Sequence, residues 1–351
     1  MPLLQLPYPE IDPVFFSIGP IPIRWYALAY IAGITLGWYY VTRLMKNTAL
    51  WQGGVSGTAP AGPPISREKF DDLLFWVTLG VILGGRLGYV IFYEPALLTD
   101  PWVSVKDMMG GTGLIQTLLG WIHIPPALMM WNGGMSFHGG LIGVTLAGYF
   151  YSRKHGLNAL AVGDLFACAA PIGLFFGRIA NFINAELYGR ETDAPWGMVF
   201  PTDPEQLVRH PSQLYEAFLE GLILFFVVRI ATHRFGVLKK PGFAIGLFLA
   251  GYGIARSIVE LYRQPDMHMP EFPFGLTMGI ILSLPMIALG AFLIWRANGG
   301  HMPKQGGDAT TASASFNADD SAKQADDAPE SQTEKRPSET KSANEATADK
   351  S

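Results

Sequence analysis

The stretch AVGDLFACAAPIGLFFGRIANFINAELYG, residues 161–189, decides the fold class of this protein. It begins as an apolar run and ends in a polar cluster that contains Arg178, Asn181, Asn184 and Glu186. A guanidinium at the end of a hydrocarbon-spanning segment is costly unless an anionic group meets it. Two interpretations are open for this stretch alone. Arg178 reaches the membrane surface beside a polar loop, or the cluster forms one wall of a site.

Composition points to a membrane protein. Only 15% of the 351 residues are charged, whereas a soluble domain carries about 25%. The net charge of −4 lies in the tail, because residues 297–351 hold ten acidic and six basic residues and the rest holds 19 of each. We therefore expect no nucleic-acid partner. The single cysteine, Cys168, excludes an internal disulfide and a thiolate metal site, and we expect it to be a small buried side chain.

Seven apolar segments have the length of a membrane span, which is about 20 residues. Helices satisfy their own backbone groups in lipid, so the sequence predicts an all-α polytopic membrane protein. A further apolar stretch, residues 113–131, is interrupted by His123, Pro125 and Pro126. We interpret it as an interfacial or re-entrant piece, because an eighth span would reverse every later loop. The seven predicted transmembrane helices lie near residues 22–42, 70–93, 137–152, 159–180, 212–230, 242–262 and 275–296.

Lysine and arginine fix the expected orientation. The connections after the first, third and fifth spans are rich in basic residues, and the seventh span ends in Arg296. The N-terminus is therefore expected outside, in the periplasm, and the C-terminus in the cytoplasm. The predicted domains are a membrane domain, residues 1–297, with external loops near 94–136 and 181–211, and a tail, residues 298–351. The composition of the tail predicts disorder.

Polar residues gather in the outer halves of six predicted spans, whereas the cytoplasmic halves are nearly free of them. Interfacial or ion-paired scaffolding explains single members, but such a role would populate both ends. The one-sided set favours a cavity open to the outer leaflet, and arginine presents a planar fork suited to a lipid phosphate. The members of the set that bear on this cavity are Tyr26, Arg86, His138, Arg178, Asn181, Glu186, Glu216, Glu220, Tyr252, Arg256 and Glu260.

His138 is the only histidine in a predicted span and is a candidate general base. No further histidine, cysteine or carboxylate follows it at metal-ligand spacing, so no metal is expected. A transporter or receptor for an anionic solute is the competing hypothesis. The near absence of polar residues from the inner half argues against a path through the membrane.

Several motifs occur in order along most of the chain. They include Gly84–Tyr89 (GGRLGY), residues 133–140 (GGMSFHGG), residues 177–189, residues 209–216 (RHPSQLYE), and Gly251 to Arg263 with Tyr252, Arg256 and Glu260. Together they resemble the bacterial prolipoprotein diacylglyceryl transferase family. Arg24 and Asn132 depart from the family pattern, which has histidine and aspartate there, and the loops near 47–66 and 103–131 look expanded.

The resemblance implies a multi-pass enzyme of the bacterial inner membrane that needs no cofactor. It implies transfer of the diacylglyceryl group of phosphatidylglycerol to the lipobox cysteine thiol of a preprolipoprotein signal peptide, the first step of lipoprotein maturation. A thioether forms and glycerol 1-phosphate leaves. By position, Arg178 and Arg256 would hold the phosphate and His138 would activate the thiol, although an arginine-assisted thiolate is the alternative. The other residues implied to bind substrate or shape the site are Tyr26, Asn181, Glu186, Gly189, Tyr252, Glu260 and Arg263. Arg86 is a candidate substrate-binding residue because of its depth in the outer cavity.

Overall fold

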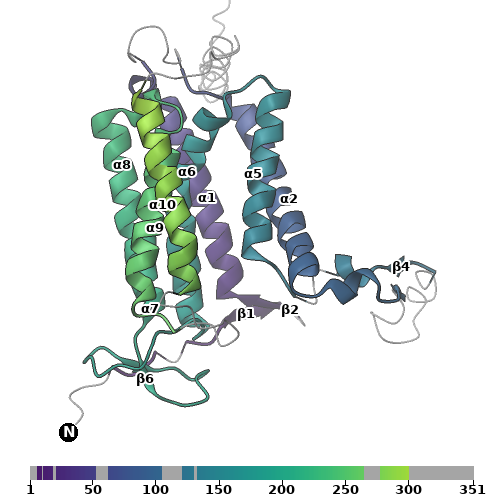
Figure 1. Cartoon of the computed structure of the whole chain (residues 1–351). Coiled ribbons are helices and arrows are strands. Elements are labelled where there is room, and N and C mark those ends of the chain that lie inside the picture. The colour runs from purple at the N-terminus through teal and green to yellow at the C-terminus, as the bar shows by residue number, and fades with distance from the viewer. Residues whose placement is uncertain are drawn as a thin grey trace, which may run out of the picture. The chain divides into compact units, whose positions relative to one another are not determined.

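The computed structural model describes residues 6–9, 11–18, 21–52, 62–104, 121–129, 133–264 and 277–299. Asn132 and nearly all of the predicted tail lie outside these residues. Seven long helical runs coincide with the seven predicted segments (Figure 1). They are α1 (Trp25–Lys46), α2 (Arg67–Phe92), α5 (Phe137–Lys154), α6 (Ala159–Ile183), the run α7 (Ser212–Glu216), η5 (Ala217–Ile223) and α8 (Leu224–Phe235), α9 (Phe243–Glu260) and α10 (Met278–Asn298).

Four of these helices are long and apolar enough to cross a membrane, namely α2, α6, α9 and α10. The protein is mostly helical, and three short antiparallel strand pairs also occur among the described residues. They are β1 (Val14–Ile18) with β2 (Ile21–Arg24), β3 (Val103–Ser104) with β4 (His123–Ile124), and β5 (Met198–Val199) with β6 (Val208–Arg209). Helix α1 begins at Trp25 rather than at residue 22, because the preceding residues pair with β1.

Local sequence explains where several helices begin and end. Ser66, Ser136 and Thr277 each accept a backbone hydrogen bond from the first turn of α2, α5 and α10. These side chains satisfy donors that a helix start leaves unpaired. Helix α8 ends at Phe235 and is followed by Gly236, whose φ of 60° is readily adopted only by glycine. Short 3-10 turns occupy Thr48–Leu50, Pro95–Leu98, Pro126–Leu128 and Val237–Lys239.

Helices α2 and α5 pack through their own backbones. Gly84 and Gly88 on α2 face Gly139 and Gly143 on α5, and a Cβ on Gly88 would lie 2.7 Å from the Cα of Gly139. Small residues permit this close approach between membrane helices. The two helices therefore form a tightly joined pair, while α1 packs on α6 and α9 packs on α10.

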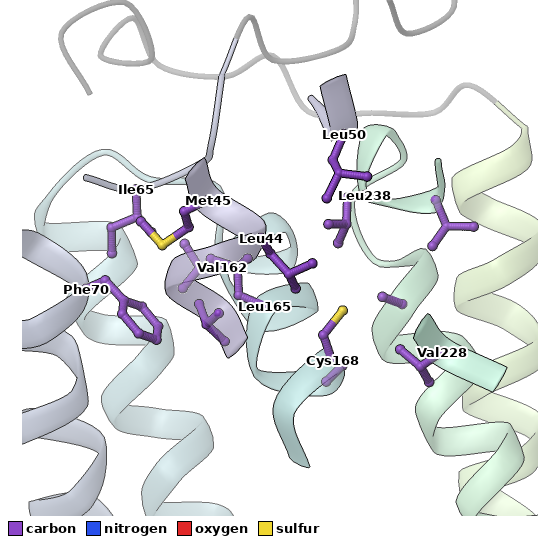
Figure 2. Close-up of a cluster of buried hydrophobic side chains, with 14 of the residues drawn as sticks. Leu44, Met45, Leu50, Ile65, Phe70, Val162, Leu165, Cys168, Val228 and Leu238 are labelled. Carbon is purple, nitrogen blue, oxygen red and sulfur yellow. The ribbon is translucent and has the colours of Figure 1, made fainter. Parts of the chain in front are cut away.

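The largest apolar core lies at the end of the bundle where α1 and α8 finish and α2 and α6 begin (Figure 2). Met45, Phe70, Leu165 and Val228 join these four helices there. Cys168 is a buried member of this core, which confirms its expected role. The polar residues considered below lie toward the opposite end, where α1, α5, α7 and α10 begin. We call this the arginine end.

Candidate active site

Two arginines and three glutamates from α6, the α7–η5 run and α9 form a continuous ladder. The Nε of Arg178 lies 3.3 Å from Oε2 of Glu216, and its Nη2 lies 3.3 Å from Oε2 of Glu220. The Nη1 of Arg256 lies 2.5 Å from Oε1 of Glu216, and its Nη2 lies 2.7 Å from Oε2 of Glu260. Glu216 is thus the central rung, because each of its oxygens meets a different arginine.

The ladder is buried and carries one carboxylate more than it has guanidinium groups. The side chains of Glu216 and Glu220 are fully buried, and those of Arg178 and Arg256 are 18% and 11% exposed. Removing charges from water costs about as much as a buried ion pair returns. Such a cluster therefore adds little to the stability of the fold. Buried ionisable groups within membrane helices mark functional sites.

Each arginine keeps a part of its guanidinium that no described residue engages. Nη1 of Arg178 and Nε of Arg256 have no hydrogen-bond partner within the part of the chain that the structure describes. Both side chains also retain some exposure. The remaining N–H groups can therefore donate to the oxygens of a ligand, and phosphate suits their planar geometry.

The local backbone positions the glutamates. Glu216 ends α7, and Glu220 lies in the π-helical segment η5. Single π-helical turns inside α-helices occur frequently at functional sites. Glu260 lies against the first turn of α10, since a Cβ on Gly279 would be 2.5 Å from its carboxylate. The positive end of the α10 dipole thus faces a carboxylate, which is the favourable arrangement.

A second polar layer lies beyond the ladder, closer to the arginine end. The Nδ2 of Asn181 donates to Oε1 of Glu186 at 2.6 Å and to the hydroxyl of Tyr26 at 3.3 Å. The Nε2 of Gln213 donates to the backbone oxygen of Glu186 at 2.6 Å. Ala185 flanks Glu186 with a φ of 54°, an uncommon backbone state for a residue other than glycine. These bonds hold the Glu186 turn over the ends of α6 and α7.

Gly189 and Arg263 meet through their backbones rather than at the ladder. The two residues form an isolated antiparallel bridge, and the N–H of Gly189 donates to the oxygen of His210 at 2.8 Å. A Cβ on Gly189 would lie 2.5 Å from the oxygen of Tyr262 and 2.6 Å from the Cβ of His210. Glycine is therefore required here for close backbone approach.

The segment between Ala185 and His210 is stabilised by a buried ion pair. Asp203 accepts hydrogen bonds from Nε and Nη2 of Arg209 at 2.6 and 3.1 Å. These bonds lower the pKa of the Asp203 carboxyl and raise the pKa of Arg209. Asp203 also accepts from the backbone N–H groups of Glu205 and Leu207. Burial lowers the pKa of His210, which favours its neutral form.

Arg86 and His138 are not brought to the ladder by any contact among the described residues. The guanidinium of Arg86 is buried and donates to four backbone oxygens, those of Pro126, Ala127, Gly133 and Gly134. It therefore holds the segment that precedes α5. His138 is exposed in the first turn of α5, and its side chain makes no hydrogen bond with a described residue.

Tyr252, Arg256 and Glu260 share one face of α9, as their spacing predicts. The ring of Tyr252 stacks on Phe248 with centroids 6.0 Å apart. The sequence placed Glu216 and Glu220 in the cavity without a specific role, and in the structure both pair with Arg178. Gln213 is also fully buried but was not among the candidate site residues, and its position within an apolar run is the signal that could have found it. Among the residues that the structure describes, no cluster of potential metal ligands occurs.

The helices and the ladder define a multi-pass membrane protein with a buried arginine–carboxylate site. The chain belongs to the prolipoprotein diacylglyceryl transferase family, whose profile matches residues 13–296. This confirms the resemblance and the expectation of a transferase. A phosphatidylglycerol–prolipoprotein diacylglyceryl transferase of Allorhizobium ampelinum is 48% identical over 294 residues, which are 83% of this chain and 92% of the relative. Transferases with the same name from Phenylobacterium zucineum and Azospirillum brasilense are 46% and 48% identical, over 83% and 84% of this chain and 94% and 97% of theirs.

Proposed function

We propose that this protein transfers the diacylglyceryl group of phosphatidylglycerol to the lipobox cysteine thiol of preprolipoproteins. The sulfur forms a bond to the glycerol carbon of the diacylglyceryl group, the bond from that carbon to the phosphate oxygen breaks, and glycerol 1-phosphate leaves. The thiol loses a proton, and the phosphate oxygen that is released from carbon gains a negative charge and can take up that proton. Family membership supports the reaction, and the ladder supports a phosphate-binding role.

The single observation that carries the site is the pair of partly engaged arginines. Arg178 and Arg256 would donate their remaining N–H groups to the headgroup phosphate and to the charge that develops on it. A donor aimed at developing charge is usually worth about 10²–10³ in rate. Asn181, Glu186 and Tyr26 would hold the outer wall of this site, and Glu260 would orient Arg256.

The thiol must lose its proton, because the thiolate is the nucleophile and a free thiol has a pKa near 8.5. His138 is the proposed base. Its exposed imidazole lies at the arginine end of α5, one of the two helices joined by glycines. Substrate would have to bridge His138 and the ladder, because no described contact joins them.

The proposed topology has all seven helical runs crossing the bacterial inner membrane, with the N-terminus outside and the C-terminus in the cytoplasm. The basic connections support this orientation. The arginine end then lies at the outer leaflet, where phosphatidylglycerol and the signal peptide of the preprotein would meet. Residues 1–297 would form the catalytic domain and residues 298–351 a cytoplasmic tail.

The decisive experiment is mass spectrometry of a lipobox cysteine peptide incubated with the purified protein and phosphatidylglycerol. A diacylglyceryl mass gain that depends on phosphatidylglycerol is expected. Arg178→Ala and Arg256→Ala should each lower the rate by at least about 100-fold. Wild-type rates in both variants would refute the phosphate role, and full activity of His138→Asn would refute only the base.

A further inference from the structure

Gln213 has a fully buried side chain, and only one of the two polar atoms of its amide has a hydrogen-bond partner among the described residues. Its Nε2 donates to the backbone oxygen of Glu186 at 2.6 Å. Its Oε1 is buried and has no hydrogen-bond partner among the described residues. Buried polar groups nearly always have a partner, so a buried acceptor without one calls for an explanation.

The assignment of the two ends of this amide is fixed by its surroundings. Amide oxygen and nitrogen are assigned from hydrogen-bond networks. If the Gln213 amide were turned over, its oxygen would face the Glu186 oxygen at 2.6 Å, and neither atom could donate. The unpartnered atom is therefore the oxygen, and its missing partner is a donor.

Gln213 lies one helical turn from the ladder. It precedes Glu216 by three residues, so it lies about 4.5 Å closer to the arginine end of the helix at 1.5 Å per residue. A phosphate held by Arg178 and Arg256 at the level of Glu216 would thus place a short headgroup beside Gln213. The Oδ1 of Asn184 is a second buried amide oxygen without a described partner, at the end of α6.

We propose that Oε1 of Gln213 accepts a hydrogen bond from a hydroxyl of the glycerol headgroup and so selects a glycerol phosphate. This inference rests on the proposed function and adds a residue that distinguishes headgroups. The arginines bind the phosphate, which every phospholipid carries. A neutral amide oxygen instead needs a hydrogen-bond donor, and it forms no hydrogen bond with an alkyl group. An analogue that lacks the hydroxyl leaves this acceptor unpaired, which costs about tenfold in transition-state binding.

The test compares two lipids that differ only in the headgroup hydroxyls, phosphatidylglycerol and phosphatidylpropanol. Both yield the same thioether on a lipobox peptide. The full-length wild-type protein should show a kcat/KM at least about tenfold higher for phosphatidylglycerol. Gln213→Met should remove this preference, so that the two lipids give the same kcat/KM, whatever further loss the missing bond to Glu186 causes on both lipids. Phosphatidylethanolamine tests whether an ammonium donor replaces the hydroxyl, and activity above that of phosphatidylpropanol in the wild type would overturn selection for hydroxyl.

A matched control is Gln206→Met. Gln206 also donates its amide to a backbone oxygen, that of Phe200 at 3.2 Å, but in the segment between Ala185 and His210. It should leave the ratio between the two lipids unchanged. Equal use of both lipids by the wild type would overturn the proposal, and so would an equal loss on both lipids in Gln213→Met.

A second measurement separates the lipid headgroup from free product and does not require turnover. Glycerol 1-phosphate should raise the melting temperature of the wild type at lower concentration than propyl phosphate does, with a difference of about tenfold. Equal stabilisation by the two phosphates would count against Gln213 even if Gln213→Met failed to fold. If the wild type transferred no lipid at all, the proposed function would fail, whereas this comparison would still decide the role of Gln213.

Discussion

The Glu216→Gln substitution tests how one carboxylate sets the chemistry of both arginines. Glu216 makes one ion pair to Arg178 and one to Arg256, and its side chain is fully buried. The substitution keeps the shape of the side chain and removes its charge. The ladder then has two carboxylates for two guanidinium groups, and a bound phosphate no longer faces an excess negative charge.

The expected effects on binding and on rate have opposite signs. A phosphate bound on the far side of a guanidinium would lie about 8 Å from the Glu216 carboxylate, and at an effective dielectric constant of 20 their repulsion is about 2 kcal/mol. Relief of that repulsion lowers KM for phosphatidylglycerol by up to about 30-fold. Loss of the charged bridge frees both arginines, and misplacement by about 1 Å costs about 100-fold in kcat.

The assay measures kcat and KM separately in mixed micelles, with thermal unfolding as a check on folding. Removing one partner of a buried ion pair costs about 3–5 kcal/mol of stability, so the melting temperature is also expected to fall. Glu205→Gln is the matched control, because Glu205 pairs with Arg209 but its side chain is 65% exposed. An unchanged kcat, or a KM that rises in a folded variant, would refute the reasoning.

Three further outcomes follow from other parts of the structure. Because Arg209 lowers the pKa of Asp203, the stability from this pair is present above the unfolded pKa of about 3.9 and is lost as pH falls through the lower folded value. Protease cleavage between residues 185 and 210 should therefore increase in acid, and Asp203→Asn should show increased cleavage already at neutral pH. Gly189→Ala should lower the melting temperature, whereas Gly148→Ala should not, since a Cβ at residue 148 meets nothing within 4 Å. Arg86→Lys should expose residues 121–129 and 133–134 to protease, because an ammonium cannot replace a planar fork that bonds four backbone oxygens.

Hydropathy predicted the helical runs well, because each apolar segment is continuous in the sequence. Helix α6 was expected at 159–180 and extends over Ala159–Ile183. The start of α1 was placed too early, because the pairing of Ile21–Arg24 with Val14–Ile18 is a contact between segments that hydropathy does not detect. Helix periodicity also gives no warning of the π-helical segment η5, which packs against α6.

The candidate site could be predicted only in its residue types and approximate depth. Arg178 and Arg256 were expected at one level, and the structure joins them through Glu216. The sequence could not tell which carboxylate would bridge them, because the partners are 38 and 40 residues apart in the chain. Arg86 was also expected beside them, because the sequence places it at a similar depth in the membrane. Its partners are instead backbone oxygens 40–48 residues away, which no side-chain pattern reveals.

The hydrogen bonds from Arg86 to the segment before α5 have a consequence for protein engineering. Helices α2 and α5 contact each other through glycines, and Arg86 holds the returning chain at four backbone oxygens, those of Pro126, Ala127, Gly133 and Gly134. Contacts among the described residues thereby anchor both ends of the connection. A reporter domain inserted between Ser104 and Trp121 should leave the two anchor points in place, so that a fluorescent or affinity tag can be carried on this face while lipid transfer continues.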